Sequence, residues 1–285
     1  GQFRIQQLIG IGAMGRVYRA HQKGIDRAVA IKILHRDLLR NPTVMARFVR
    51  EAKVASRLVH PNVVQVLMAG ELERQNADVG GEAYLVMEFL DGISLRSALA
   101  AAGTAMPLPR ALHVVLQVCD AVGEAHAQGI VHRDLKPENV MLVRRGDDAD
   151  FVKVLDFGVA RIDWADTSVA TQAGVIFGTA RYISPEGAQG KPVSAPSDVY
   201  SVAVMLIQCI AGQAPFDGDN PVAILIKHTN QPAPDVRSIA RSSYVPEPIA
   251  RVIAQNLSKG PAVRCTDARD LGHAQEEGAA GRGVW

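Results

Sequence analysis

The stretch Ile130-Val131-His132-Arg133-Asp134-Leu135-Lys136-Pro137-Glu138-Asn139 decides how the rest of this 285-residue sequence is interpreted. Asp134 supplies a carboxylate that can accept a hydroxyl proton, and Lys136 supplies an ammonium that can bind a phosphate. Asn139 adds an amide oxygen that can bind a hard cation. The stretch lies between a helical pattern and an apolar run, so we expect a loop that is held at both ends.

The composition is that of a globular protein and excludes several classes of function. Hydrophobic residues make up 48% of the sequence and charged residues 21%, which argues against disorder over most of its length. The net charge of +2 is too small to favour nucleic acid or an anionic membrane as the main partner. The three cysteines are far apart and form no C-x-x-C pair, which favours a reducing compartment and argues against a zinc site.

The two ends and the apolar runs bear on localisation. No signal-peptide pattern opens the sequence, and its longest apolar run, at about 199–211, is shorter than the ~20 residues of a membrane span. We therefore expect a soluble, cytoplasmic chain. The sequence begins at Gly1 within a strand-like pattern and without an initiator Met, so we expect a piece of a longer protein, whose anchoring segment could lie elsewhere.

A glycine-rich segment lies between two strand-like patterns near the start. It reads Gly10-Ile11-Gly12-Ala13-Met14-Gly15-Arg16-Val17, and its glycines allow the backbone to approach a phosphate closely. By itself the segment could also be an ordinary hairpin turn or a dinucleotide site. A dinucleotide site would require a helix directly after the glycines, whereas the residues that follow resemble a strand.

A lysine in the next apolar strand requires an explanation. Lys32 lies within Ala28–Leu34, where a buried and unpaired ammonium would be costly. Its candidate partner is Glu51, which lies beside the apolar stripe of the helical pattern that follows. The alternatives are a lysine that extends to solvent from an edge strand, and a solvated Glu51 that pairs with Lys53 or Arg47.

Taken in order, these motifs resemble those of protein kinases. Residues 132–139 match the catalytic loop H-R-D-x-K-x-x-N, and Asp156-Phe157-Gly158 follows a second apolar strand. Lys136 together with Thr179 is the serine/threonine pattern. Ser184-Pro185-Glu186, with Ser in place of the usual Ala, is similar to the bacterial eukaryotic-like serine/threonine kinases. The resemblance covers roughly residues 3 to 271.

This resemblance implies an α+β fold with two lobes. Residues 1–90 would form a small antiparallel sheet with one helix, and residues 91–272 a larger, mainly helical lobe. We expect a buried helix starting near Asp198, a carboxylate that ties the catalytic loop to the core. Arg264 would pair with Glu186. Gly272 interrupts the last helical pattern, so we expect residues 273–285 to form a flexible tail.

The resemblance also assigns roles within the site. Asp134 would be the catalytic base, with Lys136 and Lys32 on the phosphates and Glu51 fixing Lys32. Asn139 and Asp156 would bind Mg²⁺, or Mn²⁺ in its place. The residues implied to surround ATP, with Met87 as gatekeeper and residues 88–90 as the hinge, are Gly10, Ile11, Gly12, Ala13, Met14, Gly15, Val17, Ala30, Lys32, Met87, Glu88, Leu90 and Met141.

A second set of residues would regulate the site. Arg133 could bind a phosphorylated activation segment through bidentate hydrogen bonds. The segment contains the candidate phosphorylation sites Thr167, Ser168 and Thr171, and Thr179 near its end. His132 and Phe157 would pack beneath the site.

The implied activity is transfer of the γ-phosphoryl group of Mg-ATP to serine or threonine hydroxyls of proteins, with autophosphorylation in a transient homodimer. A pseudokinase scaffold is the first alternative, and the presence of Lys32, Asp134, Asn139 and Asp156 argues against it. The second is a small-molecule phosphotransferase of related fold, which Lys136 and the residues Pro185-Glu186 disfavour.

Overall fold

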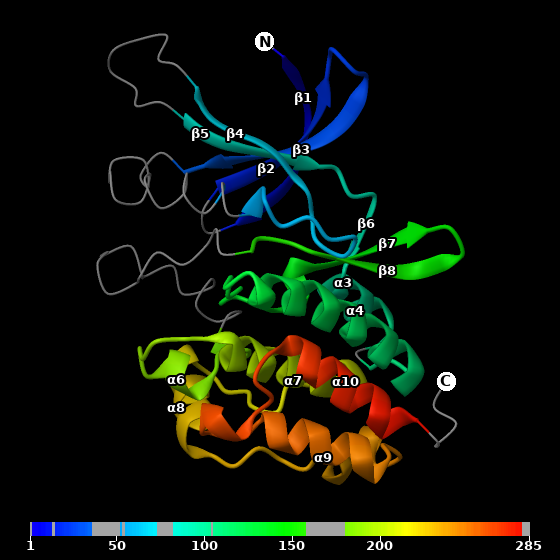
Figure 1. The fold of residues 1–285 in the computed structure, drawn as a ribbon, viewed down its shortest axis with the longest axis vertical. Coiled ribbons are helices and arrows are strands. Elements are labelled where there is room, and N and C mark those ends of the chain that lie inside the picture. The colour runs from blue at the N-terminus through cyan, green and yellow to red at the C-terminus, as the bar shows by residue number, and fades with distance from the viewer. Residues whose placement is uncertain are drawn as a thin grey trace.

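The chain folds into a small, sheet-based lobe above a larger lobe of helices (Figure 1). In this computed structural model the described residues are 2–12, 15–35, 52, 55–72, 82–103, 105–157 and 180–280. The sheet lobe is formed by the first part of the chain and the helical lobe by the second. This confirms the α+β, two-lobed architecture expected from the motifs.

The small lobe is built on one antiparallel sheet with the strand order β1-β2-β3-β5-β4. Its strands are β1 (Phe3–Gly12), β2 (Gly15–Gln22), β3 (Arg27–Leu34), β4 (Val66–Leu72) and β5 (Glu82–Glu88). The first two strands pair antiparallel on either side of the glycine-rich segment, so a strand and not a helix follows the glycines, as expected. Of the predicted helix between β3 and β4, only Ala52 and Ala55 are described as helical.

Alternation along β3 places Lys32 on the inner face of this sheet. Ala30 and Leu34 lie on the same face and belong to a buried apolar cluster with Leu85 and Met87 of β5. Residues two apart in a strand point to one side, so the lysine is carried toward the space between the lobes. Its exposure is 7%.

A second, three-stranded sheet lies between the two lobes. It consists of β6 (Gly92–Ser94), β7 (Val140–Arg145) and β8 (Asp148–Val154). The turn of the β7–β8 hairpin contains Gly146, whose φ of 60° is readily adopted by glycine. The catalytic-loop stretch leads directly into β7, and Asp156 lies two residues after the end of β8. Because Val140 pairs with Val154, this sheet brings the two motifs to the same end of its strands.

The larger lobe is helical. Its helices are α3 (Leu95–Ala101), α4 (Leu108–Ala127), α6 (Pro185–Ala188), α7 (Ala195–Ala211), α8 (Pro221–Asn230), α9 (Glu247–Asn256) and α10 (Ala268–Ala279), with short 3₁₀ turns at η1 (Pro137–Asn139), η3 (Val236–Ser238), η4 (Ala240–Ser242) and η5 (Pro261–Val263). Ser94 caps α3 by accepting a hydrogen bond from the backbone N–H of Ser97 at 3.1 Å. Asn220 caps α8 in the same way, by accepting the backbone N–H of Ala223.

Helix α7 is the centre of this lobe. It begins at Ala195, before the position near Asp198 that we expected, because Ser197 Oγ accepts the backbone N–H of Ser194 at 3.1 Å and so stabilises the helix start at this earlier position. Nearly all of its side chains are buried, which explains why its sequence is apolar on every face. No helix within the described ranges is both long and apolar enough to cross a membrane.

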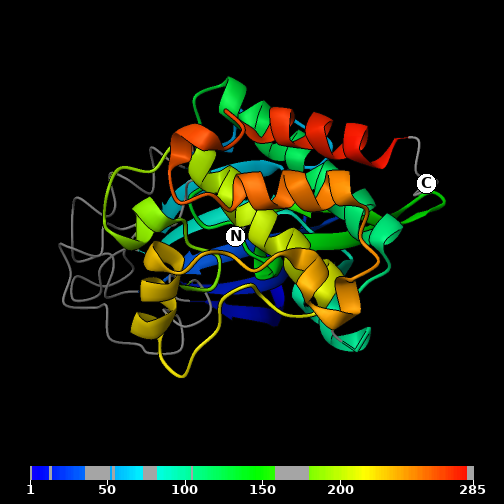
Figure 2. The same cartoon turned by 90° about the horizontal axis from the view of Figure 1, so that it is seen from below.

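Helix α10 corrects our prediction for the end of the chain. We expected a break at Gly272 and a flexible tail from residue 273, but the helix continues to Ala279 and buries Gln275 and Gly278. Gly272 is inside the helix because α10 packs closely on α4: a Cβ there would lie 3.2 Å from the Cβ of Cys119. Figures 1 and 2 both show α10 lying beside α4.

A buried ion pair joins the segment before α7 to the segment before α10. Arg264 donates to Glu186 through Nη1 at 2.8 Å and Nη2 at 2.9 Å, which confirms the predicted pairing. Ser197 donates a further hydrogen bond to the same carboxylate at 2.6 Å. The guanidinium is fully buried and the carboxylate side chain is 9% exposed, so neither charge is well solvated.

We predict that Glu186 makes stability pH-dependent in acid. Burial alone would raise the pKa of Glu186, but hydrogen bonds from Arg264 and Ser197 outweigh it and lower this pKa from 4.5 to about 2. A carboxylate with a lowered pKa stabilises the fold above its unfolded pKa and loses this contribution as pH falls. We expect a loss of about 3 kcal/mol between pH ~4.5 and ~2, measured by urea unfolding across that range.

The Glu186→Gln variant should be less stable at neutral pH, because it leaves a buried guanidinium without a charged partner. Its stability should also fall less steeply in acid than that of the unchanged chain. Glu247→Gln, at a side chain that is 56% exposed, is the control and should retain the steep dependence. Equal slopes for Glu186→Gln and the unchanged chain would show that this carboxylate does not titrate as described.

We also predict that Gln275→Met stabilises the chain. Gln275 is 1% exposed, and within the described residues neither polar atom of its side-chain amide has a hydrogen-bond partner. A buried amide without partners costs about 1–3 kcal/mol, and methionine has a similar shape without that cost. Thermal melting should show a higher midpoint for Gln275→Met, whereas Glu277→Met on the exposed side of α10 should change little. A lower midpoint for Gln275→Met would contradict the prediction.

Candidate active site

The catalytic loop is fixed by one buried carboxylate. Asp198 of α7 accepts the backbone N–H of His132 at 2.7 Å through one oxygen and that of Arg133 at 2.9 Å through the other. Its exposure is 1%. Arg133 has a φ of 71°, a conformation that the two hydrogen bonds help to maintain. The carboxylate therefore ties the loop to the core helix, as we expected.

His126 extends this anchor, and sequence reasoning did not assign it a role. Its Nδ1 accepts the backbone N–H of Ala268 at 3.2 Å, so its Nε2 carries the proton that it donates to Asp198 at 2.9 Å. One histidine thus joins α4 to α7 and to the start of α10. The only signal in the sequence is a polar residue on the otherwise apolar face of α4.

Two polar residues of the catalytic loop, Lys136 and Asn139, donate hydrogen bonds to Asp134. Lys136 Nζ donates to Asp134 Oδ2 at 2.7 Å, and Asn139 Nδ2 donates to the Asp134 carbonyl oxygen at 2.8 Å. The Asp134 and Lys136 side chains are 20% and 18% exposed, so solvent or a substrate can reach them. The 3₁₀ turn η1 between Pro137 and Asn139 turns the chain back on itself and makes this convergence possible.

Asp156 meets both the catalytic loop and the small lobe. Lys32 Nζ donates to its two carboxylate oxygens at 2.9 and 3.0 Å, although the two residues are 124 positions apart. The backbone N–H of Leu155 donates to the Asn139 carbonyl oxygen at 2.8 Å, which holds Asp156 next to the loop. Burial would raise the pKa of Asp156, but the Lys32 ammonium outweighs it and the pKa is lowered.

These contacts define a set of donors suited to a divalent cation. Asp156 offers carboxylate oxygens and Asn139 offers an amide oxygen, since the Asn139 nitrogen is already used in hydrogen bonds to Asp134. Among the described residues no cluster of three His, Cys, Asp or Glu side chains could enclose a metal. Two hard oxygen donors fit a cation such as Mg²⁺, which keeps waters and binds phosphate oxygens as well.

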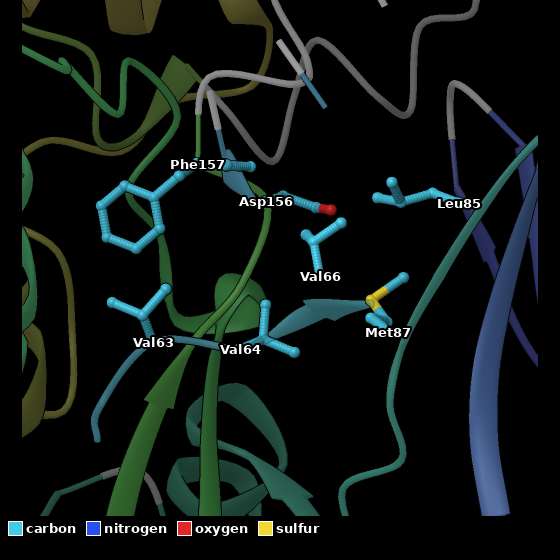
Figure 3. A pocket seen from close by; sticks show the side chains of 8 residues that line it. Val63, Val64, Val66, Leu85, Met87, Asp156 and Phe157 are labelled. Atoms are coloured by element: carbon cyan, nitrogen blue, oxygen red, sulfur yellow. The ribbon is translucent and has the colours of Figure 1, made fainter. Parts of the chain in front are cut away.

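A small apolar pocket lies behind this point. It has about 10 Å³ of free space, and Figure 3 shows its lining, which includes Met87 and Asp156. The Phe157 ring and the Asp156 carboxylate point in opposite directions in this view. Phe157 packs on His132 with ring centroids 4.7 Å apart, and His132 Nε2 donates to the Leu155 carbonyl oxygen at 2.8 Å. The two rings lie beneath the site, as we expected.

The predicted nucleotide contacts fall into groups. Val17, Ala30, Met87 and Leu90 belong to one apolar cluster on the inner face of the small lobe. Met141 lies on β7 of the second sheet and is half-buried.

The glycine-rich segment is described in part: Gly10, Ile11 and Gly12 end β1 and Gly15 begins β2. A Cβ at Gly15 would lie 2.0 Å from the Ile33 carbonyl oxygen, so only glycine fits there without a shift of the backbone.

Several predicted residues lie outside the described ranges. They are Ala13, Met14, Glu51, Gly158, Thr167, Ser168, Thr171 and Thr179. The role assigned to Glu51 therefore stays a prediction, and the described partner of Lys32 is Asp156. Arg133, the predicted regulatory residue, is an exposed residue of the catalytic loop.

Comparison with known proteins points in the same direction. Serine/threonine-protein kinase pkn3 of Myxococcus xanthus is 42% identical over 272 residues, which are 94% of this chain and 48% of that protein. Serine/threonine-protein kinase PknB of Mycolicibacterium smegmatis is 38% identical over 95% of this chain and 42% of that protein. The chain thus spans less than half the length of these curated relatives.

Solved structures agree with the fold. The crystal structure of the Mycobacterium tuberculosis PknI kinase domain, C20A mutant, has a TM-score of 0.73 and 26% identity, and covers 98% of this chain and 96% of that chain. The family model described as "Protein kinase domain" matches residues 3–275. With the catalytic loop, Asp156 and Lys32 brought together as described above, this chain belongs to the protein kinase family.

Proposed function

We propose that this chain is the catalytic domain of a serine/threonine protein kinase that transfers the γ-phosphoryl group of Mg-ATP to protein hydroxyls. One observation carries the proposal: the ion pair between Lys32 and Asp156 places an ammonium of the small lobe beside the oxygen donors of the large lobe. Positive charge and hard oxygen ligands at one point are what binding of a triphosphate with its cation requires.

Asp134 would act on the acceptor hydroxyl. The hydroxyl oxygen forms a bond to the γ-phosphorus, the bond from that phosphorus to the bridging β-phosphate oxygen breaks, and ADP leaves. Asp134 takes the hydroxyl proton. Lys136, at 2.7 Å from Asp134, would stabilise the charge of the phosphoryl group in transfer, so that positioning and electrostatics supply most of the rate.

Lys32 would bind the α- and β-phosphates, and Glu51 would fix Lys32 when the nucleotide is present. Asn139 and Asp156 would hold the divalent cation, which when bound would neutralise phosphate charge. Adenine would lie among Val17, Ala30 and Met87, facing the main chain of residues 88–90, and Met141 would close this site from the large lobe. The glycine-rich segment, including Ala13 and Met14, would cover the phosphates and exclude water.

Regulation would act through the activation segment. We propose that it is phosphorylated at Thr171, with Thr167 and Ser168 as further sites, and that the exposed Arg133 binds the resulting phosphate. Phosphorylation of one copy by another would require a transient homodimer. We place this activity in the cytoplasm, where ATP and reduced thiols are both present.

A small-molecule phosphotransferase and a pseudokinase scaffold are the alternatives. Lys136 and the Glu186–Arg264 pair, both typical of protein kinases, argue against the first. The pseudokinase scaffold is disfavoured because Lys32, Asp134, Asn139 and Asp156 are all present and lie close together.

We predict that Asp134→Asn abolishes transfer and preserves nucleotide binding. Asparagine keeps the shape of the side chain but cannot take the proton, and the loss of a general base costs about 10²–10⁴-fold in rate. Transfer of radiolabelled phosphate to a generic basic protein measures the rate, and calorimetry measures the Kd for nucleotide.

Asp147→Asn, in the exposed β7–β8 turn, is the matched control and should remain active. Autophosphorylation retained by Asp134→Asn would remove Asp134 from the role of base. Transfer to sugars or antibiotics, without any transfer to protein, would favour the small-molecule alternative.

We predict that the active chain phosphorylates itself at Thr171, with lower occupancy at Thr167 and Ser168. Phosphopeptide mapping after incubation with Mg-ATP tests this, and the Asp134→Asn protein supplies the background. Thr171→Ala should lower the total incorporation of phosphate. Active protein with an unmodified segment would refute the prediction.

A further inference from the structure

The side chain of Glu88 links the end of β5 to two other segments. We predicted residues 88–90 as the hinge, with no separate role for the Glu88 side chain. Its carboxylate Oε1 instead accepts the backbone N–H of Gln65 at 2.8 Å and the ammonium of Lys153 at 2.7 Å. Lys153 lies on β8, so this ion pair connects the hinge of the small lobe to the second sheet.

The segment that precedes β4 takes part in the same connection. Residues 62–65, which we name the strap, run beside β8: Val64 N–H donates to the Val154 carbonyl oxygen at 2.9 Å, and Val154 N–H donates to the Asn62 carbonyl oxygen at 2.7 Å. Lys153 Nζ also donates to the Val63 carbonyl oxygen at 3.2 Å. The strap is therefore bonded to the second sheet before the chain enters β4.

The hinge main chain is bonded to the strap as well, since Glu88 N–H donates to the Gln65 carbonyl oxygen at 3.0 Å. Glu88 thus contacts the strap through both its backbone and its side chain. The next residue is held from the other side, because the Arg19 guanidinium of β2 lies 4.7 Å from the centre of the Phe89 ring. Successive residues of the hinge are restrained by different segments.

The Glu88–Lys153 pair is sheltered. The two side chains are 30% and 16% exposed, and the distance of 2.7 Å is that of a charge-assisted hydrogen bond. Such a pair is screened less than a surface ion pair, which contributes little. The Lys153 ammonium donates a second hydrogen bond, to the Val63 carbonyl oxygen of the strap, and the two bonds together fix its position.

We propose that Glu88 and Lys153 are positioning residues for the nucleotide: their ion pair holds the hinge main chain in the conformation that binds the base. This inference rests on the proposed function, because it concerns the nucleotide site proposed above. Recognition by main-chain groups depends on a backbone that is fixed in advance, since ordering it upon binding would cost affinity. Neither side chain needs to contact the ligand for this effect.

The test compares Lys153→Met, Glu88→Gln and the double variant with the unchanged chain. Calorimetry gives the Kd for a non-hydrolysable ATP analogue with Mg²⁺, and kinetics give the separate KM values for ATP and for a protein acceptor. We expect each single variant to raise the Kd and the KM for ATP about five- to tenfold, with the KM for the acceptor unchanged. The double variant should bind the nucleotide no more weakly than the weaker-binding single variant. Each single substitution already removes the same Glu88–Lys153 interaction, so the two losses should not add.

Arg110→Met is the matched control. Arg110 forms an ion pair of similar length, 2.8 Å, with Asp150 on the same strand β8, but neither residue contacts the hinge in the described structure. The Arg110→Met substitution should leave the Kd for the nucleotide unchanged. Lys153→Arg, which restores a cation, should recover most of the lost affinity, a result that a general loss of packing would not give.

Unchanged or tighter nucleotide binding by Lys153→Met and Glu88→Gln would overturn the inference. So would losses that add fully in the double variant, or an equal loss in Arg110→Met. If the unchanged chain bound no nucleotide, the proposed function itself would be contradicted. If the unchanged chain and all variants bound the nucleotide equally well, only the inference about Glu88 and Lys153 would be contradicted. Glu88→Gln is nearly isosteric, so it keeps the test meaningful if Lys153→Met folds poorly.

Discussion

The rest of the site depends on the buried carboxylate of Asp198. It accepts two backbone N–H groups of the catalytic loop and the ring N–H of His126, so three protein donors stabilise its buried charge. Hydrogen bonds to a charged group are worth about 1.5–3 kcal/mol each, enough to hold Arg133 at a positive φ. Because Asp198 is on the most buried helix, the loop takes its position from the core of the large lobe.

The two lobes meet through contacts of different kinds. At the proposed nucleotide site, Lys32 and Asp156 form an ion pair. A bound triphosphate and its cation would each interact with one of these two charges. Next to the hinge, the strap is joined to β8 by backbone hydrogen bonds, and Glu88 and Lys153 add an ion pair. The lobes are therefore joined both by an ion pair at the proposed nucleotide site and by a separate set of hydrogen bonds at the strap.

Much of the site was predictable because its motifs are local. Asp134, Lys136 and Asn139 lie within one short loop, and a 3₁₀ turn is enough to bring them together. The end of the chain was predicted wrongly for a physical reason. Glycine lowers helix propensity, yet Gly272 lies inside α10, where the absence of a side chain allows this helix to pack closely against Cys119. Likewise, the helical signal of α10 does not reveal that Gln275 is buried without hydrogen-bond partners in the described structure.

By itself, the sequence determined the order of the elements and the residue types that the chemistry needs, because periodicity and short motifs depend on neighbours along the chain. The two-lobed class followed from the resemblance of these motifs to those of protein kinases. Only the tertiary structure decided which distant groups meet: Lys32 with Asp156, His126 with Asp198, and Glu88 with Lys153. A side chain's type shows that it needs a partner when buried. Which partner it finds depends on how sheets and helices pack, and this is set by the whole chain at once.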